Sequence, residues 1–205
     1  MARLVIGRAG DPGLTPDLLD AMFRLRHDVF KRRLHWNVAA AGGREKDRFD
    51  DLDPVYAIAC TDDGTLMGCL RLLPTTAPYM LADVFPQALR GEPAPRSPDV
   101  WEMSRLASVT AVARSGPQAQ VPLGLTASLL ITGAADYAVR QGVRELCAFT
   151  TPAVERIGRT LGFRPLRFGD GSPIRYGRVA SVAVRVPIGH DQRARDPLAL
   201  RIGGR

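Results

Sequence analysis

Cysteine and histidine are scarce in this sequence, with three of each among 205 residues. The cysteines form no closely spaced pair of the kind that binds zinc or builds a disulfide framework. Each one lies in an apolar, strand-like run, so we expect buried free thiols at Cys60, Cys69 and Cys147. No zinc-binding helix motif includes the histidines, which are His27, His35 and His190. The sequence therefore predicts no metal site.

Long apolar runs are also missing. The apolar run nearest to Met1 is Leu4 to Ile6, which is far too short for the apolar part of a signal peptide. No other segment approaches the roughly 20 apolar residues that a membrane-spanning helix needs. The sequence therefore predicts a cytoplasmic protein with no stable membrane association.

Motifs of nucleophilic catalysis and nucleic-acid binding are absent too. There is neither a Gly-x-Ser-x-Gly turn nor a phosphate-binding loop of the P-loop type. The net charge of +7 is concentrated at 24–33 and 190–205, and such a field attracts phosphates, anionic membranes and acidic proteins alike. Because no nucleic-acid motif accompanies these basic segments, we expect no nucleic-acid partner. A solvated helix face and a frayed end are the alternative explanation of the charge.

The spacing of apolar residues predicts an α/β fold. A chain of 205 residues is long enough for one domain with a full core. Helical spacing, with glycine and proline signals at the ends, predicts helices at about 17–34, 121–142 and 152–162. Alternating or continuous apolar runs predict about seven strands, at 2–8, 55–61, 65–75, 100–109, 143–150, 163–168 and 178–188. Helices interleaved with hairpins predict a mixed sheet that is covered on both faces.

Charged residues interrupt several of these apolar segments. Arg26 lies on the apolar side of the first helix, and Arg71 shares a strand face with Cys69. A guanidinium in such a place either reaches out to solvent or meets a buried anion. Both arginines are therefore candidates for a functional site, and internal ion pairing without any chemistry is the alternative.

Glu102 and Arg105 raise the same question within one strand. They lie three residues apart, so a regular strand would place them on opposite faces of the sheet. A β-bulge at Ser104 would bring both to one face, and bulges are common beside active sites. The alternative is an ion pair of Glu102 with Arg71 or Arg105 that has no catalytic role.

The segment 37–54 has no apolar period and carries glycines and charges, so we predict a long loop. Its acidic residues lack the spacing of a calcium-binding loop. Phe30 and Trp36 lie nearby as aromatic surfaces, which makes the acids candidate acceptors for a cationic ligand. The alternative is an ordinary solvated loop. The acids are Glu45, Asp47, Asp50, Asp51 and Asp53.

Six fragments of the first half occur in a distinctive order. They are Arg26, "VF" at 29–30, "LHW" ending at Trp36, "EKDRFD" at 45–50, "GCLRLLPTTAPYMLADVF" at 68–85 and "WEMSRL" at 101–106. Together they resemble the acyl-homoserine-lactone synthases, the bacterial autoinducer synthase family. The resemblance implies one domain over 1–189 with an N-acetyltransferase-like α/β/α sandwich around a mixed, twisted sheet. It leaves 190–205 as a basic, flexible tail.

The resemblance also implies an activity. An enzyme of this family makes an N-acyl-homoserine lactone, a quorum-sensing signal, from S-adenosylmethionine and an acyl thioester, and it releases methylthioadenosine. S-adenosylmethionine is then a substrate, and no cofactor is implied. The acyl donor is either acyl carrier protein or acyl-coenzyme A, and the absence of a Q/R-x-x-G-x-G/A signature favours the carrier protein. The rival interpretation is another N-acyltransferase of the same fold that uses acyl-coenzyme A without S-adenosylmethionine.

The family's invariant positions all have counterparts in this chain. The resemblance implies that S-adenosylmethionine is bound by Arg26, Phe30, Trp36, Asp47 and Asp50. The implied catalytic residues are Glu102, Arg71 and Arg105. Glu102 would act as general base, directly or through one water, because the substrate amine must lose a proton before it attacks. Some of the arginines would orient carboxylates or brace the acidic loop.

The acyl chain is expected in an apolar tunnel between the sheet and the long helix. Leu106 stands where the family usually has phenylalanine, and this difference changes the expected shape of the acyl pocket beside it. The family threonine that accompanies 3-oxo chains aligns with Ala148, although a shift of two residues would bring Thr150 there. The alignment favours an acyl group without the 3-oxo substituent, with straight, branched and aryl groups all left open. The predicted tunnel residues, for each of which plain core packing is the alternative, are Met80, Leu106, Leu123, Thr126, Leu130, Ala148 and Phe149.

Basic residues on the first helix are candidates for binding an acidic carrier protein. Such docking relies on long-range charge attraction, which salt weakens. The residues are Arg24, Lys31, Arg32 and Arg33.

Overall fold

The computed structural model describes residues 2–109 and 123–189. The predicted tail, 190–205, therefore lies outside the described residues. The α-helices are α1 (Pro16–Arg26), α2 (Met80–Asp83), α3 (Leu123–Arg140) and α4 (Pro152–Thr160). A π-helix (His27–Arg33) continues α1, and short 3-10 helices occur at Arg48–Asp51 and Pro86–Leu89. The strands are β1 (Ala2–Gly7), β2 (Ala40–Ala41), β3 (Arg44–Glu45), β4 (Val55–Thr61), β5 (Leu66–Pro74), β6 (Val100–Ser108), β7 (Glu145–Thr150), β8 (Leu166–Arg167), β9 (Ile174–Tyr176) and β10 (Val179–Pro187).

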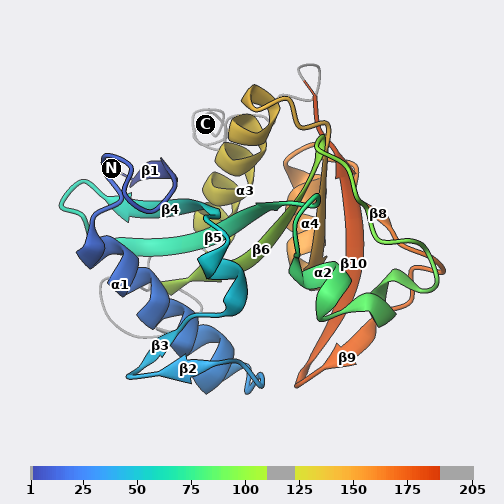
Figure 1. The fold of residues 1–205 in the computed structure, drawn as a ribbon, viewed down its shortest axis with the longest axis horizontal. Coiled ribbons are helices and arrows are strands. Elements are labelled where there is room, and N and C mark those ends of the chain that lie inside the picture. The colour runs from blue at the N-terminus through green and yellow to red at the C-terminus, as the bar shows by residue number, and fades with distance from the viewer. Residues whose placement is uncertain (1, 110–122, 190–205) are drawn as a thin grey trace, which may run out of the picture.

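Eight of these strands form one mixed sheet (Figure 1). Its order is β1-β4-β5-β6-β7-β10-β8, and β9 pairs with β10 outside that path. The strands β6 and β7 pair in parallel, whereas the other described pairs are antiparallel. The predicted mixed sheet is confirmed, and β9 is the strand of this sheet that the apolar pattern missed.

Helices cover both faces of the sheet, with α1 and α2 in front and α3 and α4 behind in the view of Figure 1. On the α1 side, the helix packs over Tyr56, Ile58 and Cys69. On the opposite side, α3 packs over Ala57 and Leu70, which alternate with the first set along the strands. The α/β/α sandwich expected from the resemblance is therefore the observed architecture.

The first helix begins and buries its apolar side as the sequence predicts. Thr15 caps it through its side-chain oxygen, which accepts a hydrogen bond from the Leu18 backbone, and Pro16 occupies the first helical position. The apolar stripe that includes Met22 and Leu25 is buried. Arg26 is the last α-helical residue and lies on the same side, fully buried. The helix thus places a guanidinium against the sheet.

The parallel contact between β6 and β7 is short. Paired residues run only from Val100 opposite Glu145 to Glu102 opposite Cys147. Beyond Glu102, β6 remains paired with β5 and β7 remains paired with β10, but β6 and β7 no longer pair with each other. This gap in the sheet opens beside Glu102.

The segment 37–54 is more ordered than predicted. It contains the hairpin β2–β3 and the 3-10 helix Arg48–Asp51, so the prediction of a plain loop is wrong for these residues. The hairpin turns at Gly42 and Gly43, both at positive φ, which glycine adopts without steric cost. Two-residue strands are too short to produce a detectable apolar period.

The cysteine prediction is confirmed, since Cys60, Cys69 and Cys147 are buried and form no disulfide. Among the helices of residues 2–109 and 123–189, none is long and apolar enough to cross a membrane.

Candidate active site

Three arginines and three acids meet in a buried cluster on the α1 side of the sheet. The arginines come from α1, β5 and β6, and they are Arg26, Arg71 and Arg105. The acids come from one short segment around β3 and the 3-10 helix, and they are Glu45, Asp47 and Asp50.

Carboxylates surround the Arg26 guanidinium. Its Nε donates to Glu45 Oε2 at 2.6 Å, and its two Nη atoms donate to the two oxygens of Asp50 at 2.7 and 2.8 Å. Burial acts to lower the pKa of Arg26, but the hydrogen bonds and charges of Asp50 and Glu45 outweigh it and raise that pKa. Arg26 is thus a fixed cation with its donors directed at protein acids.

Arg71 and Arg105 complete the cluster from the neighbouring strands. Nη1 of Arg71 donates to Asp47 Oδ1 at 2.6 Å and to Asp50 Oδ1 at 2.8 Å. Nη2 of Arg105 donates to Glu45 Oε1 at 2.8 Å and to Asp47 Oδ2 at 2.7 Å. Each acid therefore bridges two arginines, and the six groups form a closed ring of alternating charge. We call this arrangement the charge ring.

Local structure fixes the acids before the arginines reach them. Asp47 caps the 3-10 helix by accepting a hydrogen bond from the Phe49 backbone at 2.9 Å. Asp50 in turn accepts from the Asp47 backbone N–H at 2.8 Å and from the Tyr56 hydroxyl at 2.9 Å. Burial alone would raise the pKa of Asp50, but Arg26 and Arg71 hold it below its usual value. Asp50 is therefore ionised at neutral pH.

A β-bulge in β6 directs Arg105 into the charge ring. Arg71 lies opposite Ser104 and Cys69 lies opposite Ala107, so two residues of β6, Arg105 and the next, oppose one residue of β5. Arg105 has φ of 56°, an uncommon value for a residue with a side chain. The predicted bulge is confirmed, but its extra residue is at 105 and not at 104. It places Glu102 and Arg105 on the same face of the sheet.

Glu102 is the buried carboxylate of the site that has no arginine partner within residues 2–109 and 123–189. Its side chain accepts hydrogen bonds from the backbone N–H groups of Met80 at 3.2 Å and Leu81 at 2.6 Å, at the start of α2. Among the described residues it makes no ion pair, so the alternative of a pair with Arg71 or Arg105 is wrong. Burial raises the pKa of Glu102 above its usual value, although the two backbone donors and the charge of Arg71 oppose this. Glu102 is therefore a stronger base than an exposed glutamate.

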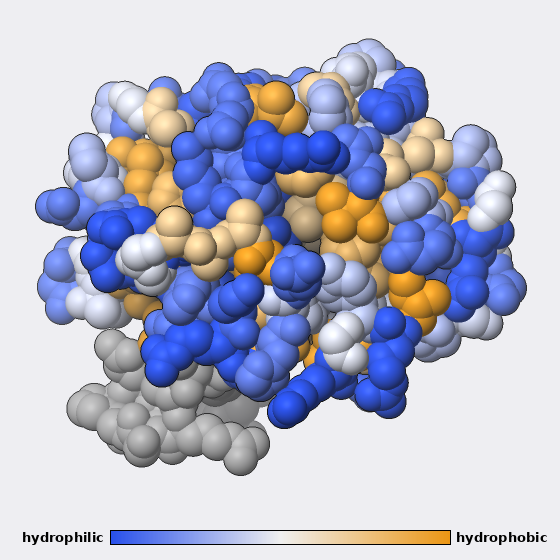
Figure 2. All heavy atoms as spheres, turned by 60° about the horizontal axis from the view of Figure 1, so that its bottom comes forward, coloured by the Kyte–Doolittle hydropathy of each residue, from blue (hydrophilic) through white to orange (hydrophobic). Residues whose placement is uncertain are grey.

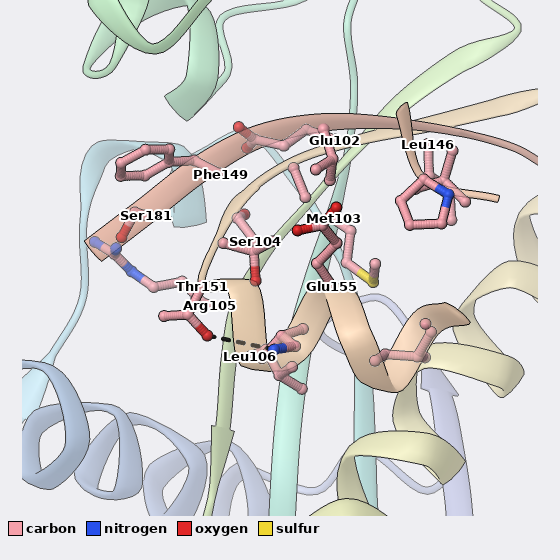
Figure 3. Close-up of a pocket in the computed structure, with 18 of the residues that line it drawn as sticks. Glu102, Met103, Ser104, Arg105, Leu106, Leu146, Phe149, Thr151, Glu155 and Ser181 are labelled. Atoms are coloured by element: carbon pink, nitrogen blue, oxygen red, sulfur yellow. Dashed lines mark hydrogen bonds between the residues drawn. The ribbon is translucent and has the colours of Figure 1, made fainter. Parts of the chain in front are cut away.

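An apolar cavity of about 150 Å³ adjoins Glu102. Its lining includes Met80 and Phe85 on the α2 side of the sheet and Ile131 and Val154 on the α3 and α4 side, so it passes through the gap between β6 and β7. The close-up in Figure 3 shows the β6 residues that border it, Glu102 among them. Figure 2, which brings the lower end of Figure 1 forward, shows apolar patches near the middle of a mostly polar face. A basic carboxylate thus lies at the wall of an otherwise apolar space.

The predicted tunnel residues divide into those that line this cavity and those that do not. Met80, Leu106, Ala148 and Phe149 line it. Thr126 and Leu130 are buried in the core, where both face Gly68 of β5, and they are not among the lining residues. The side chain of Leu123 lies outside the described part of the chain. Residues of α4 and the segment after it line the cavity without having been predicted, and they are Val154, Glu155, Gly158, Phe163 and Pro165.

Aromatic rings border the same cavity. Phe30 and Trp36 stack with centroids 5.3 Å apart, and Trp36 meets Tyr176 edge to face at 5.1 Å. The Arg105 guanidinium lies over the Phe30 ring at 5.1 Å, which joins the aromatic residues to the charge ring. The structure therefore brings together all eight residues that the resemblance assigned to substrate binding and catalysis. It adds Tyr56 and Tyr176, which the sequence did not single out, and Glu45, which was predicted only as one of five candidate acids of the loop.

The four residues predicted to dock a carrier protein are exposed on α1 and its π-helical extension. Arg24 pairs with Asp20 at 2.7 Å, and Arg32 pairs with Asp28 at 3.2 Å. Lys31 and Arg33 make no ion pair with described residues. The surface is therefore basic and open, which fits the prediction without testing it.

The sequence of the chain is similar to one family of enzymes over most of its length. The sequence model of the family described as autoinducer synthase matches residues 14–195. An acyl-homoserine-lactone synthase from Ralstonia solanacearum is 40% identical over 182 residues, which span 79% of this chain and 82% of the relative.

Solved structures give the same picture. The crystal structure of the AHL synthase LasI is 33% identical with a TM-score of 0.80, covering 91% of this chain and 90% of that one. The CoA-dependent acyl-homoserine lactone synthase BjaI, solved with SAM and isopentyl-CoA, is 29% identical with a TM-score of 0.81, covering 99% and 90%. An N-acetyltransferase of Lactobacillus plantarum, only 16% identical with a TM-score of 0.55 and a coverage of 91% and 98%, shares the fold.

Proposed function

The chain belongs to the autoinducer synthase family, and from this premise we propose that it makes an N-acyl-homoserine lactone from S-adenosylmethionine and an acyl thioester. The observation that carries the proposal is the position of Glu102. This buried carboxylate pairs with no arginine of the described residues. It lies at the wall of an apolar cavity, next to a charge ring that is neutral as a whole. The site therefore offers one basic, negatively charged group to a cationic substrate and an apolar space to an acyl chain.

Glu102 is suited to remove the proton that blocks the first step. The α-amino group of S-adenosylmethionine, with a pKa of about 8, is mostly protonated at neutral pH and cannot attack a thioester in that form. Glu102 takes this proton, directly or through one water, and the neutral amine attacks the thioester carbonyl. The nitrogen–carbon bond forms, the carbon–sulfur bond of the thioester breaks, and the thiol leaves with a proton. The product of this step is an N-acyl S-adenosylmethionine.

The second step closes the lactone. The carboxylate of the acylated methionyl group attacks its own γ-carbon, the bond from that carbon to the sulfonium breaks, and neutral methylthioadenosine leaves. No proton is consumed, so the protein contributes mainly by holding the chain in a geometry ready for attack. Phe30, Trp36 and Tyr176 provide aromatic surfaces for the adenosine or sulfonium part. The reaction needs no cofactor besides its two substrates.

We assign the charge ring first of all to bracing this site. Each of its acids already binds two arginines, so the ring fixes the segment around β3 against β5 and β6. Asp47 keeps 12% of its side chain exposed, more than Glu45 or Asp50, and is therefore the ring carboxylate we expect to contact S-adenosylmethionine.

The acyl donor is either an acyl carrier protein or acyl-coenzyme A. The exposed basic face of α1 and the π-helix favours an acidic protein, whereas BjaI, similar in fold and sequence, was solved with a coenzyme A thioester. Both substrates occur in the cytoplasm, where we place the reaction.

Mass spectrometry of the purified protein's products tests the proposal. The protein is incubated with S-adenosylmethionine and a set of acyl thioesters on both carriers, and the expected products are an acyl-homoserine lactone and an equal amount of methylthioadenosine. The Glu102→Gln variant, checked for folding, serves as the control and should lose both products. An amide product without methylthioadenosine release would support the rival N-acyltransferase, and turnover by Glu102→Gln would remove Glu102 from the base role.

A further inference from the structure

Gly158 is a glycine on the inner side of α4. It lies four residues after Val154 and three after Glu155, and all three residues line the cavity. Since residues three and four apart share a helix face, a side chain at 158 would point the same way as these neighbours. Glycine is the least favourable residue in a helix interior after proline, so its presence there calls for a reason.

Space around Gly158 supplies that reason. Apart from its two chain neighbours and the backbone of its own helix, a Cβ atom built on Gly158 meets no atom of a described residue within 4 Å. At Gly68 and Gly133, in contrast, a Cβ would clash with packed neighbours. Gly158 is therefore not a point of close helix packing. The absent side chain leaves open space next to the cavity.

Small residues also border this part of the cavity from the other elements. Ala135 of α3 and Ala148 of β7 line it, together with the larger Ile131 and Phe163. These residues lie behind the sheet, on the side of α3 and α4, whereas Glu102 contacts α2 on the front side. An acyl group whose carbonyl is near Glu102 would extend through the gap toward Gly158.

We propose that Gly158 is a specificity-determining residue, which makes room for the end of the acyl group and thereby sets the longest chain the enzyme accepts. This inference rests on the proposed function. A larger side chain at position 158 would occupy part of the space for the acyl chain, at about one acyl carbon lost for each side-chain carbon added. The preferred donor should therefore become shorter as the side chain at 158 grows.

Competition between acyl donors tests this inference. Wild type, Gly158→Ala and Gly158→Leu are each given a mixture of donors that differ by one carbon, on one carrier type, and the lactones are quantified by mass spectrometry. We expect Gly158→Ala to lower the ratio of longer to shorter products, and Gly158→Leu to lower it by about ten-fold or more, since one methylene in an apolar site changes specificity by 10- to 200-fold. Ala153→Leu adds similar bulk on the exposed side of α4 and should leave the ratio unchanged.

The outcomes separate this inference from the proposed function. If wild type makes no lactone with any donor, the proposed function fails. If wild type makes lactones and both Gly158 variants give the wild-type product ratio, the specificity role is overturned. Should Gly158→Leu fail to fold in a thermal melt, the ratio measured with Gly158→Ala decides, because alanine favours the helix.

Discussion

Arg26 and Asp50 face each other in a two-pronged ion pair, with contacts of 2.7 and 2.8 Å between their paired atoms. The pair joins the end of α1 to the segment before β4, and Arg71 and Tyr56 bind the same carboxylate from β5 and β4. Ion pairs of this kind are costly to break one partner at a time, because the remaining charge stays buried.

The first prediction concerns the stability that depends on Arg26. Replacing it by glutamine in Arg26→Gln leaves Glu45 and Asp50 with one cation fewer, and we expect the free energy of unfolding to fall by about 3–5 kcal/mol. Arg24→Gln removes an exposed arginine two residues away, whose pair with Asp20 should contribute less than about 1 kcal/mol. Urea unfolding of both variants, followed by circular dichroism, measures the difference. Equal losses would contradict a structural role for the charge ring.

The second prediction concerns the hydroxyl of Tyr56. Its hydrogen bond to Asp50 is buried and goes to a charged acceptor, so Tyr56→Phe should lower the free energy of unfolding by about 1.5–3 kcal/mol. Tyr137→Phe is the matched control, because the Tyr137 hydroxyl has no hydrogen bond to a described residue. The two values come from parallel urea titrations, and a Tyr56→Phe loss no greater than that of the control would refute the prediction.

The third prediction concerns the pH dependence of catalysis. A general base works only when ionised, so kcat/KM should fall as the pH drops through the pKa of Glu102. Burial raises this pKa above the usual value of 4.5, and the acid limb should therefore lie above that value. In Glu102→Gln, kcat/KM should fall by about 10²–10⁴-fold. Its remaining pH dependence should then reflect only the ionisation of the substrate amine.

Glu145→Gln is the control for this experiment. Burial raises the pKa of Glu145 as well, but its side chain is not part of the cavity lining. It should keep the wild-type rate and the wild-type acid limb. If both variants lost activity alike, the loss would reflect stability and not proton transfer.

The fourth prediction concerns the exposed basic surface after α1. Replacing Lys31, Arg32 and Arg33 together by alanine should raise the KM for an acyl carrier protein donor by about ten-fold at low salt, with little change in kcat. The effect should shrink as salt is added, because the attraction is screened. An acyl-pantetheine donor, which lacks both protein and phosphate, should be unaffected. An unchanged KM for the carrier donor would place the docking surface elsewhere.

The sequence predicted the longer helices and strands, and it drew attention to charged residues that the structure brings together, for identifiable reasons. The buried stripe that includes Met22 and Leu25 follows helical spacing. Glu102 and Arg105 lie an odd number of positions apart, so only an irregular strand could place both on one face. That separation could not show where the extra residue lies, because a bulge anywhere between the two would bring them to one face. The choice of position 105 depends on pairing with β5, a contact distant in sequence.

Other parts of the site could not be predicted. Glu45 looks no different in sequence from Asp51 or Asp53, yet it is buried between two arginines while the other two lie at the surface. Apolar residues surround α3, so the sequence could not show which of its faces borders the cavity. Leu130 faces β5, and its neighbour Ile131 lines the cavity.

The short contact between β6 and β7 separates the charged residues of the site from the residues that line the far end of the cavity, and the two groups lie in different parts of the chain. The charge ring and Glu102 come from residues before the gap, whereas Ala148, Val154 and Gly158 belong to the part after it. A substitution in the α4 wall therefore replaces no member of the charge ring. Relatives that share this arrangement can therefore differ in the acyl group of their product while they keep Glu102 and the charge ring.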